Sequence, residues 1–207
     1  LGGRFAKHLT KIGLKVRIGS SRENPNIPVE LNSCEIVKID FNDNNSIDQA
    51  CNKVSCILHL AALNSLECEE EPESALVVNS LGTLRLLESA KKSGVSKFLY
   101  LSTAHVYGSF LSGLINERTL PRPSNHYAIT HKMAEDYVIN FNDPGKFNTC
   151  IFRLTNAIGS PLSQNNNCWM LITNDLCKKI SMNQKSVIHS NKNITRELTL
   201  ILYECIQ

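Results

Sequence analysis

Short apolar runs alternate along the chain with longer segments of helical periodicity. The apolar runs predict strands, at 14–19, 35–39, 54–60, 97–101 and 148–154. The segments between them predict helices, at 4–12, 46–53, 72–93 and 125–141. Strands that are apolar nearly throughout and that alternate with helices are typical of a parallel α/β sheet with helices on both faces.

The helix that begins at Pro72 has the clearest boundaries. Proline suits a first helical turn, and Gly94 stands where a glycine commonly ends a helix. Between them an apolar stripe recurs at helical spacing, formed by Leu76, Val77, Leu81, Leu84 and Leu87.

The two ends of the chain depart from this pattern. The chain opens on Gly2 and Gly3 and a helix, whereas a doubly wound fold begins with a strand whose following turn carries phosphate-binding glycines. After Ile194 the chain ends in an apolar run with no predicted closing element. We therefore expect a Rossmann-like doubly wound parallel sheet from which the first strand and a C-terminal portion are missing. A complete chain with an unusual start is the alternative.

Composition and charge exclude several other classes. A length of 207 residues suffices for one large domain, or for one domain and part of a second, and 42% hydrophobic residues is an ordinary globular value. The net charge of +3 is too small and too dispersed for a nucleic-acid surface. No apolar stretch approaches the roughly 18 residues of a membrane span. We expect neither a nucleic-acid partner nor a membrane.

The cysteines point to a reducing compartment. The 8 cysteines form no CxxC pair and no Cys/His spacing suited to a metal. Several stand inside apolar runs, where a free cysteine behaves as a small hydrophobic residue. A reduced, cytoplasmic chain without a metal is therefore expected.

The segment 127–132, Tyr-Ala-Ile-Thr-His-Lys, carries the main candidate chemistry. His131 follows Tyr127 by one helical turn and shares its face, whereas Lys132 is rotated by about a further 100°. A phenol with a reference pKa of about 10 needs a lower pKa to act near pH 7. An imidazole is largely neutral at that pH, so it lowers the pKa of Tyr127 less than a permanent cation would. Taken alone, the pair also fits a buried aromatic and a surface imidazole.

Motifs spread along the chain, taken in order, resemble one family. They are Leu-Gly-Gly-Arg-Phe at 1–5, Ile-Leu-His-Leu-Ala-Ala at 57–62, Asn-Ser-Leu-Gly-Thr at 79–83, Leu-Ser-Thr-Ala-His-Val-Tyr-Gly at 101–108, Pro123 with Tyr127, and Arg-Leu-Thr-Asn at 153–156. The chain resembles an extended short-chain dehydrogenase/reductase of the NAD-dependent epimerase/dehydratase type, which acts on nucleotide sugars. The resemblance implies an NAD(P)-binding Rossmann-like domain over 1–162, without its first strand, and the start of a truncated substrate-binding portion over 163–207.

The resemblance also implies a role for each matched position. Thr103, Tyr127 and His131 would be catalytic, with Tyr127 as the general acid/base at a sugar hydroxyl or carbonyl. Thr103 and Asn156 would contact the substrate. The residues expected to bind the cofactor are Gly2, Gly3, Arg22, Asp40, Phe41, Leu60, Ala61, Ala62, Asn79, Tyr127, His131, Leu154 and Thr155.

In such a fold, the residues at the end of the second strand determine the choice between NAD and NADP. NAD-selective domains place an acidic residue there, whereas an arginine accommodates a 2′-phosphate. Here the strand runs into Gly-Ser-Ser-Arg at 19–22 without a carboxylate. We expect NAD(P), with a preference for NADP, although an ordinary polar turn with an exposed Arg22 explains the segment equally well. Asp40 could likewise be a turn residue.

The expected function is that of an NAD(P)-dependent epimerase, dehydratase or reductase, which moves a hydride transiently or with net transfer at a carbon of a nucleotide sugar. A homodimer is one expected assembly. Two alternatives stay open. One is a non-catalytic NAD(P)-binding sensor or regulator whose Tyr-x-x-x-Lys site has degraded. The other is a reductase of small carbonyl substrates.

Overall fold

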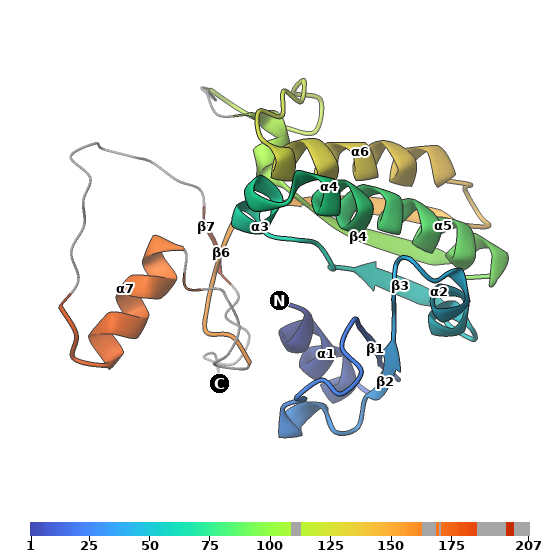
Figure 1. Ribbon diagram of the computed structural model, residues 1–207, viewed down its shortest axis with the longest axis horizontal. Coiled ribbons are helices and arrows are strands. Elements are labelled where there is room, and N and C mark those ends of the chain that lie inside the picture. Colours follow the sequence, from blue (N-terminus) through green and yellow to red (C-terminus); the bar gives the residue numbers. More distant parts are fainter. Residues whose placement is uncertain (109–112, 163–168, 170, 186–197, 201–207) are drawn as a thin grey trace.

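The computed structural model describes residues 1–108, 113–162, 169, 171–185 and 198–200 (Figure 1). Its helical segments are α1 (Gly2–Lys11), η1 (Val29–Leu31), α2 (Asn44–Cys51), α3 (Ser65–Glu70), α4 (Pro72–Ala75), η2 (Leu76–Leu81), α5 (Gly82–Lys92), η3 (Ala104–Tyr107), α6 (His126–Phe141) and α7 (Ile172–Ser181). Its strands are β1 (Arg17–Ser20), β2 (Glu35–Lys38), β3 (Cys56–His59), β4 (Lys97–Thr103), β5 (Asn148–Leu154), β6 (Asn156–Ile158) and β7 (Leu198–Leu200).

Every strand pair in the described part of the chain is parallel, which confirms the parallel α/β class. The strands form separate ladders, β1–β2, β3–β4–β5 and β6–β7. In space, none of the described strands bridges β1 and β3. Hydrogen bonds therefore do not join these ladders into one sheet. The pattern of apolar runs predicted β1 to β5, but it did not predict β6 and β7. Most of the portion expected over 163–207 lies outside the described residues.

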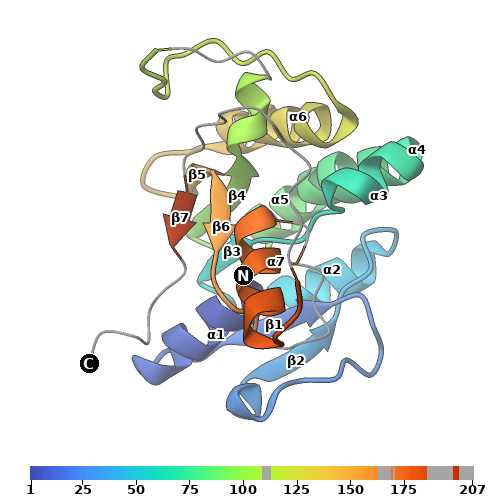
Figure 2. The same cartoon turned by 90° about the vertical axis from the view of Figure 1, so that its left-hand side faces the viewer.

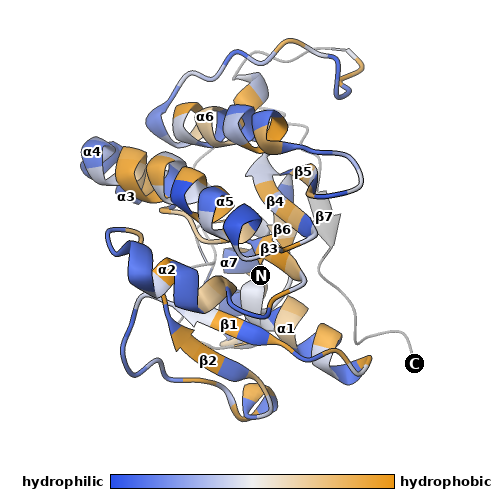
Figure 3. Cartoon of the chain, turned by 90° about the vertical axis from the view of Figure 1, so that its right-hand side faces the viewer, coloured by the Kyte–Doolittle hydropathy of each residue, from blue (hydrophilic) through white to orange (hydrophobic). Residues whose placement is uncertain are grey.

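The main core lies between the β3–β4–β5 sheet and the helices α2, α5 and α6. Phe98 and Tyr100 project from β4 into this layer and are 0% and 2% exposed. Leu87 of α5 and Val138 of α6 meet them there and are fully buried. Figure 3 shows hydrophobic residues along β3, whereas α2 is largely hydrophilic on the side toward the viewer. Each large apolar side chain buried in this way stabilises the fold by about 1.5–3 kcal/mol.

A smaller core lies under α1 and holds it against β1, β2 and η1. Ala6, Leu31 and Cys34 form its buried centre. Leu162, which lies far along the sequence, packs against it. In Figure 2, α1, β1 and β2 form a group below β3 and β4. None of the helices in the described part of the chain is long and apolar enough to span a membrane.

The helix predicted from Pro72 is observed as α4, η2 and α5 in continuous succession. Proline occupies the first turn of α4, and Gly94 follows α5 with a positive φ of 76°, as its place in the sequence predicts. The Val95 N–H donates to the Ala90 carbonyl at 3.0 Å and closes the helix end. The middle segment, η2, is π-helical, and such widened turns are frequent at functional sites.

The loop after β2 is locked onto α5 by a close approach at Gly82. A Cβ added at Gly82 would lie 2.7 Å from the Phe41 ring, so only glycine fits there without displacing the ring. Arg85 Nη1 donates to the Phe41 carbonyl and fixes the same loop. The Phe41 ring also meets the His59 ring edge-on, with 5.9 Å between centroids. This contact places the residues after β2 beside the end of β3.

Candidate active site at the carboxyl edge of the sheet

The carboxyl ends of β3, β4 and β5 lie at one edge of their sheet. Thr103 of β4 is in register with Leu154 of β5, and His59 of β3 is in register with Tyr100. The first turn of α1 reaches the same edge, because a Cβ on Gly2 would lie 3.6 Å from Leu60 Cδ1. Positions far apart in the sequence and expected to bind cofactor therefore meet at the edge where α/β sheets bind ligands.

Tyr127 stands in the first turn of α6, opposite Thr103. Asn125 caps this helix, its side chain accepting from the Ala128 N–H at 2.8 Å. The Thr103 hydroxyl lies beside the Tyr127 phenol, close enough to lower the pKa of that phenol. Thr103 Oγ1 accepts from the His105 N–H at 3.2 Å, so its own proton is available for another acceptor.

The environment of Tyr127 raises the pKa of its phenol. Burial is the largest cause, because it disfavours the phenolate. The Thr103 hydroxyl lowers the pKa, and the nearby Cys68 thiol raises it again. Any activation of this tyrosine must therefore overcome burial.

His131 lies one turn after Tyr127 and is only 2% exposed. Its Nδ1 is 2.9 Å from the Tyr127 carbonyl oxygen, which can only accept. Nδ1 therefore carries the proton, and in the neutral ring Nε2 is an acceptor. Burial lowers the pKa of His131; the Tyr127 carbonyl and Glu135 oppose that shift, and His105 adds to it. The two rings lie with centroids 4.2 Å apart.

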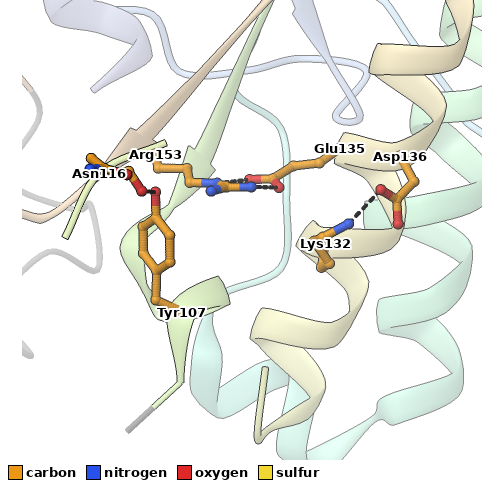
Figure 4. A network of polar contacts seen from close by, with 6 residues as sticks. All are labelled: Tyr107, Asn116, Lys132, Glu135, Asp136 and Arg153. Atoms are coloured by element: carbon orange, nitrogen blue, oxygen red, sulfur yellow. Dashed lines mark hydrogen bonds and ion pairs between the residues drawn. The ribbon is translucent and has the colours of Figure 1, made fainter. Parts of the chain in front are cut away.

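The side chain of Lys132 points in a different direction from that of His131. It pairs with the carboxylate of Asp136, one turn along the outer side of α6 (Figure 4). The helical geometry thus gives the position beside Tyr127 to the imidazole and not to the ammonium.

A column of buried rings continues from His131 into the core. The Tyr100 ring stacks 6.2 Å from His131 and 5.6 Å from His59, measured between centroids. Thr83 Oγ1 donates to the Asn79 carbonyl and lies 3.0 Å from His59 Nε2, so Nε2 must be the donor of the second bond. Burial lowers the pKa of His59 to about 4, and His131 contributes in the same direction. The sequence pattern gave no indication of the contact between His59 and Thr83.

Asn79 is an expected cofactor residue, but its side-chain amide forms hydrogen bonds with other residues of the protein. Its Oδ1 accepts from the Leu63 N–H at 2.8 Å, and its Nδ2 donates to Thr130 Oγ1 at 3.0 Å. These bonds tie the segment after β3 to α6, beside Tyr127. A direct contact between Asn79 and a cofactor stays a prediction.

The remaining expected residues lie around this edge. Ser20 Oγ accepts from the exposed Arg22 N–H at 3.1 Å, and Asp40 Oδ1 accepts from the Asn42 N–H at 2.9 Å, so both segments are tight turns. Ala61 and Ala62 are exposed after β3. Thr155 and Asn156 are half-buried after β5. In the described ranges, no group of three or more His, Cys, Asp and Glu side chains could hold a metal ion.

The chain belongs to the NAD dependent epimerase/dehydratase family, whose sequence model matches residues 1–200. The UDP-glucose 4-epimerase of Rhizobium leguminosarum bv. trifolii is 32% identical over 124 residues, which are 58% of this chain and 38% of that protein. The dTDP-D-glucose 4,6-dehydratase of Mus musculus is 33% identical over 108 residues, 52% of this chain and 30% of that protein. The chain thus matches well under half the length of these relatives.

Solved structures share the fold. The UDP-glucose 4-epimerase of Thermotoga maritima superposes with a TM-score of 0.84 over 96% of this chain and 65% of that one, at 20% identity. MoeE5 in complex with UDP-glucuronic acid and NAD is 27% identical, with a TM-score of 0.66 over 76% of this chain and 52% of that one. These likenesses confirm the Rossmann-like class.

The buried His59 makes stability depend on pH. Its pKa is about 4 when folded and about 6.5 when unfolded, so its contribution is complete above pH 6.5 and is lost as the pH falls toward 4. We expect the free energy of unfolding to fall by about 1.4 kcal/mol per pH unit in this window, roughly 3 kcal/mol in all. Urea unfolding at pH 7.5, 6, 5 and 4 measures the slope.

Variants assign that slope to its residue. His59→Gln keeps a donor for Thr83 but does not titrate, so its acid dependence should be shallower. His126, exposed at the start of α6, supplies the matched control His126→Gln, which should keep the full slope. Equal slopes in the wild type and His59→Gln would contradict the assignment.

Proposed function

We propose that the protein is an NAD(P)-dependent epimerase, dehydratase or reductase of a nucleotide sugar, working by transient or net hydride transfer. The placement of Thr103 beside Tyr127 at the carboxyl edge of the sheet is the observation that carries this proposal. Residues 1–162 would form the cofactor-binding domain, and 163–207 would begin the substrate-binding portion. The named relatives and MoeE5 support a nucleotide sugar as the substrate class.

The residues at the sheet edge fit a dinucleotide. Gly2 and Gly3 form the first turn of α1, and Leu1 before them has no side-chain oxygen to cap the helix. Amide groups at such a helix start favour a pyrophosphate, and the lack of side chains lets it approach. Leu60, Leu154 and Thr155 would then line the path of the cofactor along the strand ends. When bound, the nicotinamide ring would supply the hydride acceptor.

The proton is handled by the protein's own groups. During oxidation at a sugar carbon, Tyr127 in its phenolate form would take the proton of the sugar hydroxyl while the hydride leaves for the nicotinamide, and the phenol would return that proton on reduction. Thr103 would hydrogen-bond the same sugar oxygen and keep it within reach, with Asn156 as a further substrate contact. His131 would hold the cofactor ribose through a neutral ring.

The choice of cofactor rests on two observations that favour different forms. MoeE5 and a short-chain dehydrogenase/reductase superfamily protein from Agrobacterium tumefaciens, 27% and 28% identical, carry NAD. In this chain the turn after β1 has the exposed Arg22 and no carboxylate, which suits a 2′-phosphate. We therefore propose NAD(P), with NADP as the form that the residues favour.

Replacing Tyr127 by Phe tests the catalytic assignment. The chain is incubated with NAD+ or NADP+ and with UDP-glucose, dTDP-glucose and GDP-mannose, and separately with NADH or NADPH and a small ketone. Loss of the acid/base should reduce kcat by about 10²–10⁴-fold. Cofactor affinity, measured by fluorescence titration, should change little. Tyr137→Phe on the same helix is the matched control, and equal turnover by Tyr127→Phe and the wild type would refute the role. Turnover of the ketone alone would favour the small-carbonyl reductase.

The second candidate function is a non-catalytic NAD(P)-binding sensor, which His131 motivates because it brings no permanent charge to Tyr127. His131→Lys separates the two functions. If the protein is an enzyme adapted to His131, the variant should lose turnover, since a lysine cannot accept at the position of Nε2. A wild type that binds cofactor without turnover, together with a gain of activity in His131→Lys, would support the sensor. Initial rates from pH 6 to 10 measure the effect.

We also propose that the protein forms a homodimer through η2, α5 and α6. These helices line an apolar groove, formed by Leu76, Val77, Ser80, Leu81, Leu84, Met133 and Tyr137. Leu76 and Met133 are 46% and 42% exposed, and exposed apolar patches of this kind mark interfaces. A twofold axis would bury the same patch on both copies, as in most homo-oligomers.

Sedimentation velocity tests this assembly. Leu81→Glu places a charge in the groove and should convert the dimer to a monomer. Ile180→Glu, at an apolar position 68% exposed on α7, is the control and should leave the dimer intact. A wild type that sediments as a monomer at 50 μM would end the proposal.

A further inference from the structure

We propose that the buried ion pair between Glu135 and Arg153 is a positioning device for the active site. It would hold the helix that carries Tyr127 in register with the strand ends that carry Thr103 and Asn156. The inference rests on the proposed function for its kinetic consequence, but its geometric part does not depend on turnover.

The pair is bidentate, with a buried carboxylate and a partly buried guanidinium. Arg153 Nε donates to Glu135 Oε1 at 2.9 Å, and Arg153 Nη2 donates to Oε2 at 2.7 Å (Figure 4). The Glu135 side chain is 0% exposed and the Arg153 side chain 18%. Two parallel bonds between a planar fork and a carboxylate fix orientation as well as distance. Glu135 raises the pKa of the guanidinium further, so this cation stays charged.

Glu135 lies on the active-site face of α6. It follows His131 by one helical turn, and His131 follows Tyr127 by one turn, so the three side chains share one stripe. A rotation or slide of α6 would move all three together. The carboxylate of Glu135 is thus an anchor for the depth and the rotation of Tyr127.

Arg153 is the anchor on the sheet. It stands in β5 opposite Ser102 of β4, one position before the Thr103–Leu154 pair that ends the ladder. The bond to Glu135 therefore connects α6 to the strand ends within one residue of Thr103 and Leu154. Asn156 begins β6 shortly beyond.

Arg153 also reaches the segment that follows Thr103. Its guanidinium carbon is 4.7 Å from the centroid of the Tyr107 ring in η3. The Tyr107 hydroxyl donates to the Asn116 carbonyl at 2.9 Å and extends the network into the next loop (Figure 4). One guanidinium thus touches α6 and η3 while standing on β5, the three segments that flank the proposed site.

The energetics of buried ion pairs allow positioning to be separated from stability. Breaking such a pair leaves an unpaired buried charge and destabilises strongly, whereas replacing both partners by apolar residues of similar volume is often neutral. Misplacement of a catalytic group by about 1 Å can cost roughly 10²-fold in rate. A double apolar replacement should therefore keep the fold and lose the fixed geometry.

The test uses the whole chain with Glu135→Leu and Arg153→Met combined. We expect its urea midpoint to stay near that of the wild type while kcat falls at least about tenfold. KM for the nucleotide sugar and Kd for NAD+ or NADP+ should change by less than about threefold, because bound groups are not removed. Nitrogen-15 NMR of the His131 ring reports geometry without cofactor, and the Nδ1–H signal held by the Tyr127 carbonyl should shift or broaden.

The exposed pair on the same helix is the matched control. Lys132→Met combined with Asp136→Leu also removes an ion pair of α6, but on its outer side, and should change neither kcat nor the His131 signal. Arg153→Lys keeps the charge and loses the fork, so it tests the geometry if the double replacement fails to fold. It should retain the fold and show the same fall in kcat.

An unchanged kcat and an unchanged His131 signal in a folded Glu135→Leu/Arg153→Met protein would show that the pair only fills space. If the wild type has no turnover, the proposed function fails, and the His131 signal still decides whether the pair fixes α6. The two failures are therefore distinguishable.

Discussion

The parallel register of β3, β4 and β5 is the constraint on which the rest of the structure depends. Parallel strands need a crossover that returns the chain to the starting edge, and α6 is the crossover between β4 and β5. Because α6 runs against the strands, its first turn lies at their carboxyl edge. Tyr127 in that turn and Thr103 at the end of β4 therefore meet, although a long loop separates them in the sequence. Their proximity therefore follows from the topology of the sheet.

Burial determines which side chains near this edge are charged. His59, Tyr100 and His131 are buried side by side, and burial lowers the pKa of both imidazoles and raises the pKa of the Tyr100 phenol. All three groups are therefore favoured in their neutral forms. The partly buried guanidinium of Arg153 beside α6 is paired with Glu135. Among the described groups, the causes that shift the pKa of Tyr127 include no cation. Activation of the phenol would thus fall to Thr103 and to the positive charge of an oxidised nicotinamide.

The sequence predicts the parts of this arrangement that depend on local pattern. Apolar runs indicate β1 to β5, and helical spacing indicates α1, α2, α5 and α6. The family resemblance implied that Thr103, Tyr127 and His131 share one site, and the structure places Thr103 and His131 each beside Tyr127. The short helix α3 was missed, although Asn64 and Glu67 form its capping box and are visible in the sequence. The partners of His59 and Glu135 were missed because they lie 24 and 18 residues away and come from other elements. A carboxylate between Ala134 and Val138 on a buried helical face was the available signal for Glu135.

His131 differs from the lysine of a Tyr-x-x-x-Lys motif in its hydrogen-bonding capacity as well as in its charge. A lysine at that position can only donate hydrogen bonds. His131 gives its Nδ1 proton to the Tyr127 carbonyl, so its neutral ring has only an acceptor left at Nε2. A ribose hydroxyl that reached Nε2 would have to donate, and its own oxygen would then be free to accept from another group. In the proposed function, binding the ribose and activating the phenol, which one ammonium could do together, would be separate tasks. The first can pass to His131, whereas the second must pass to groups whose geometry depends on how firmly α6 is held against the sheet.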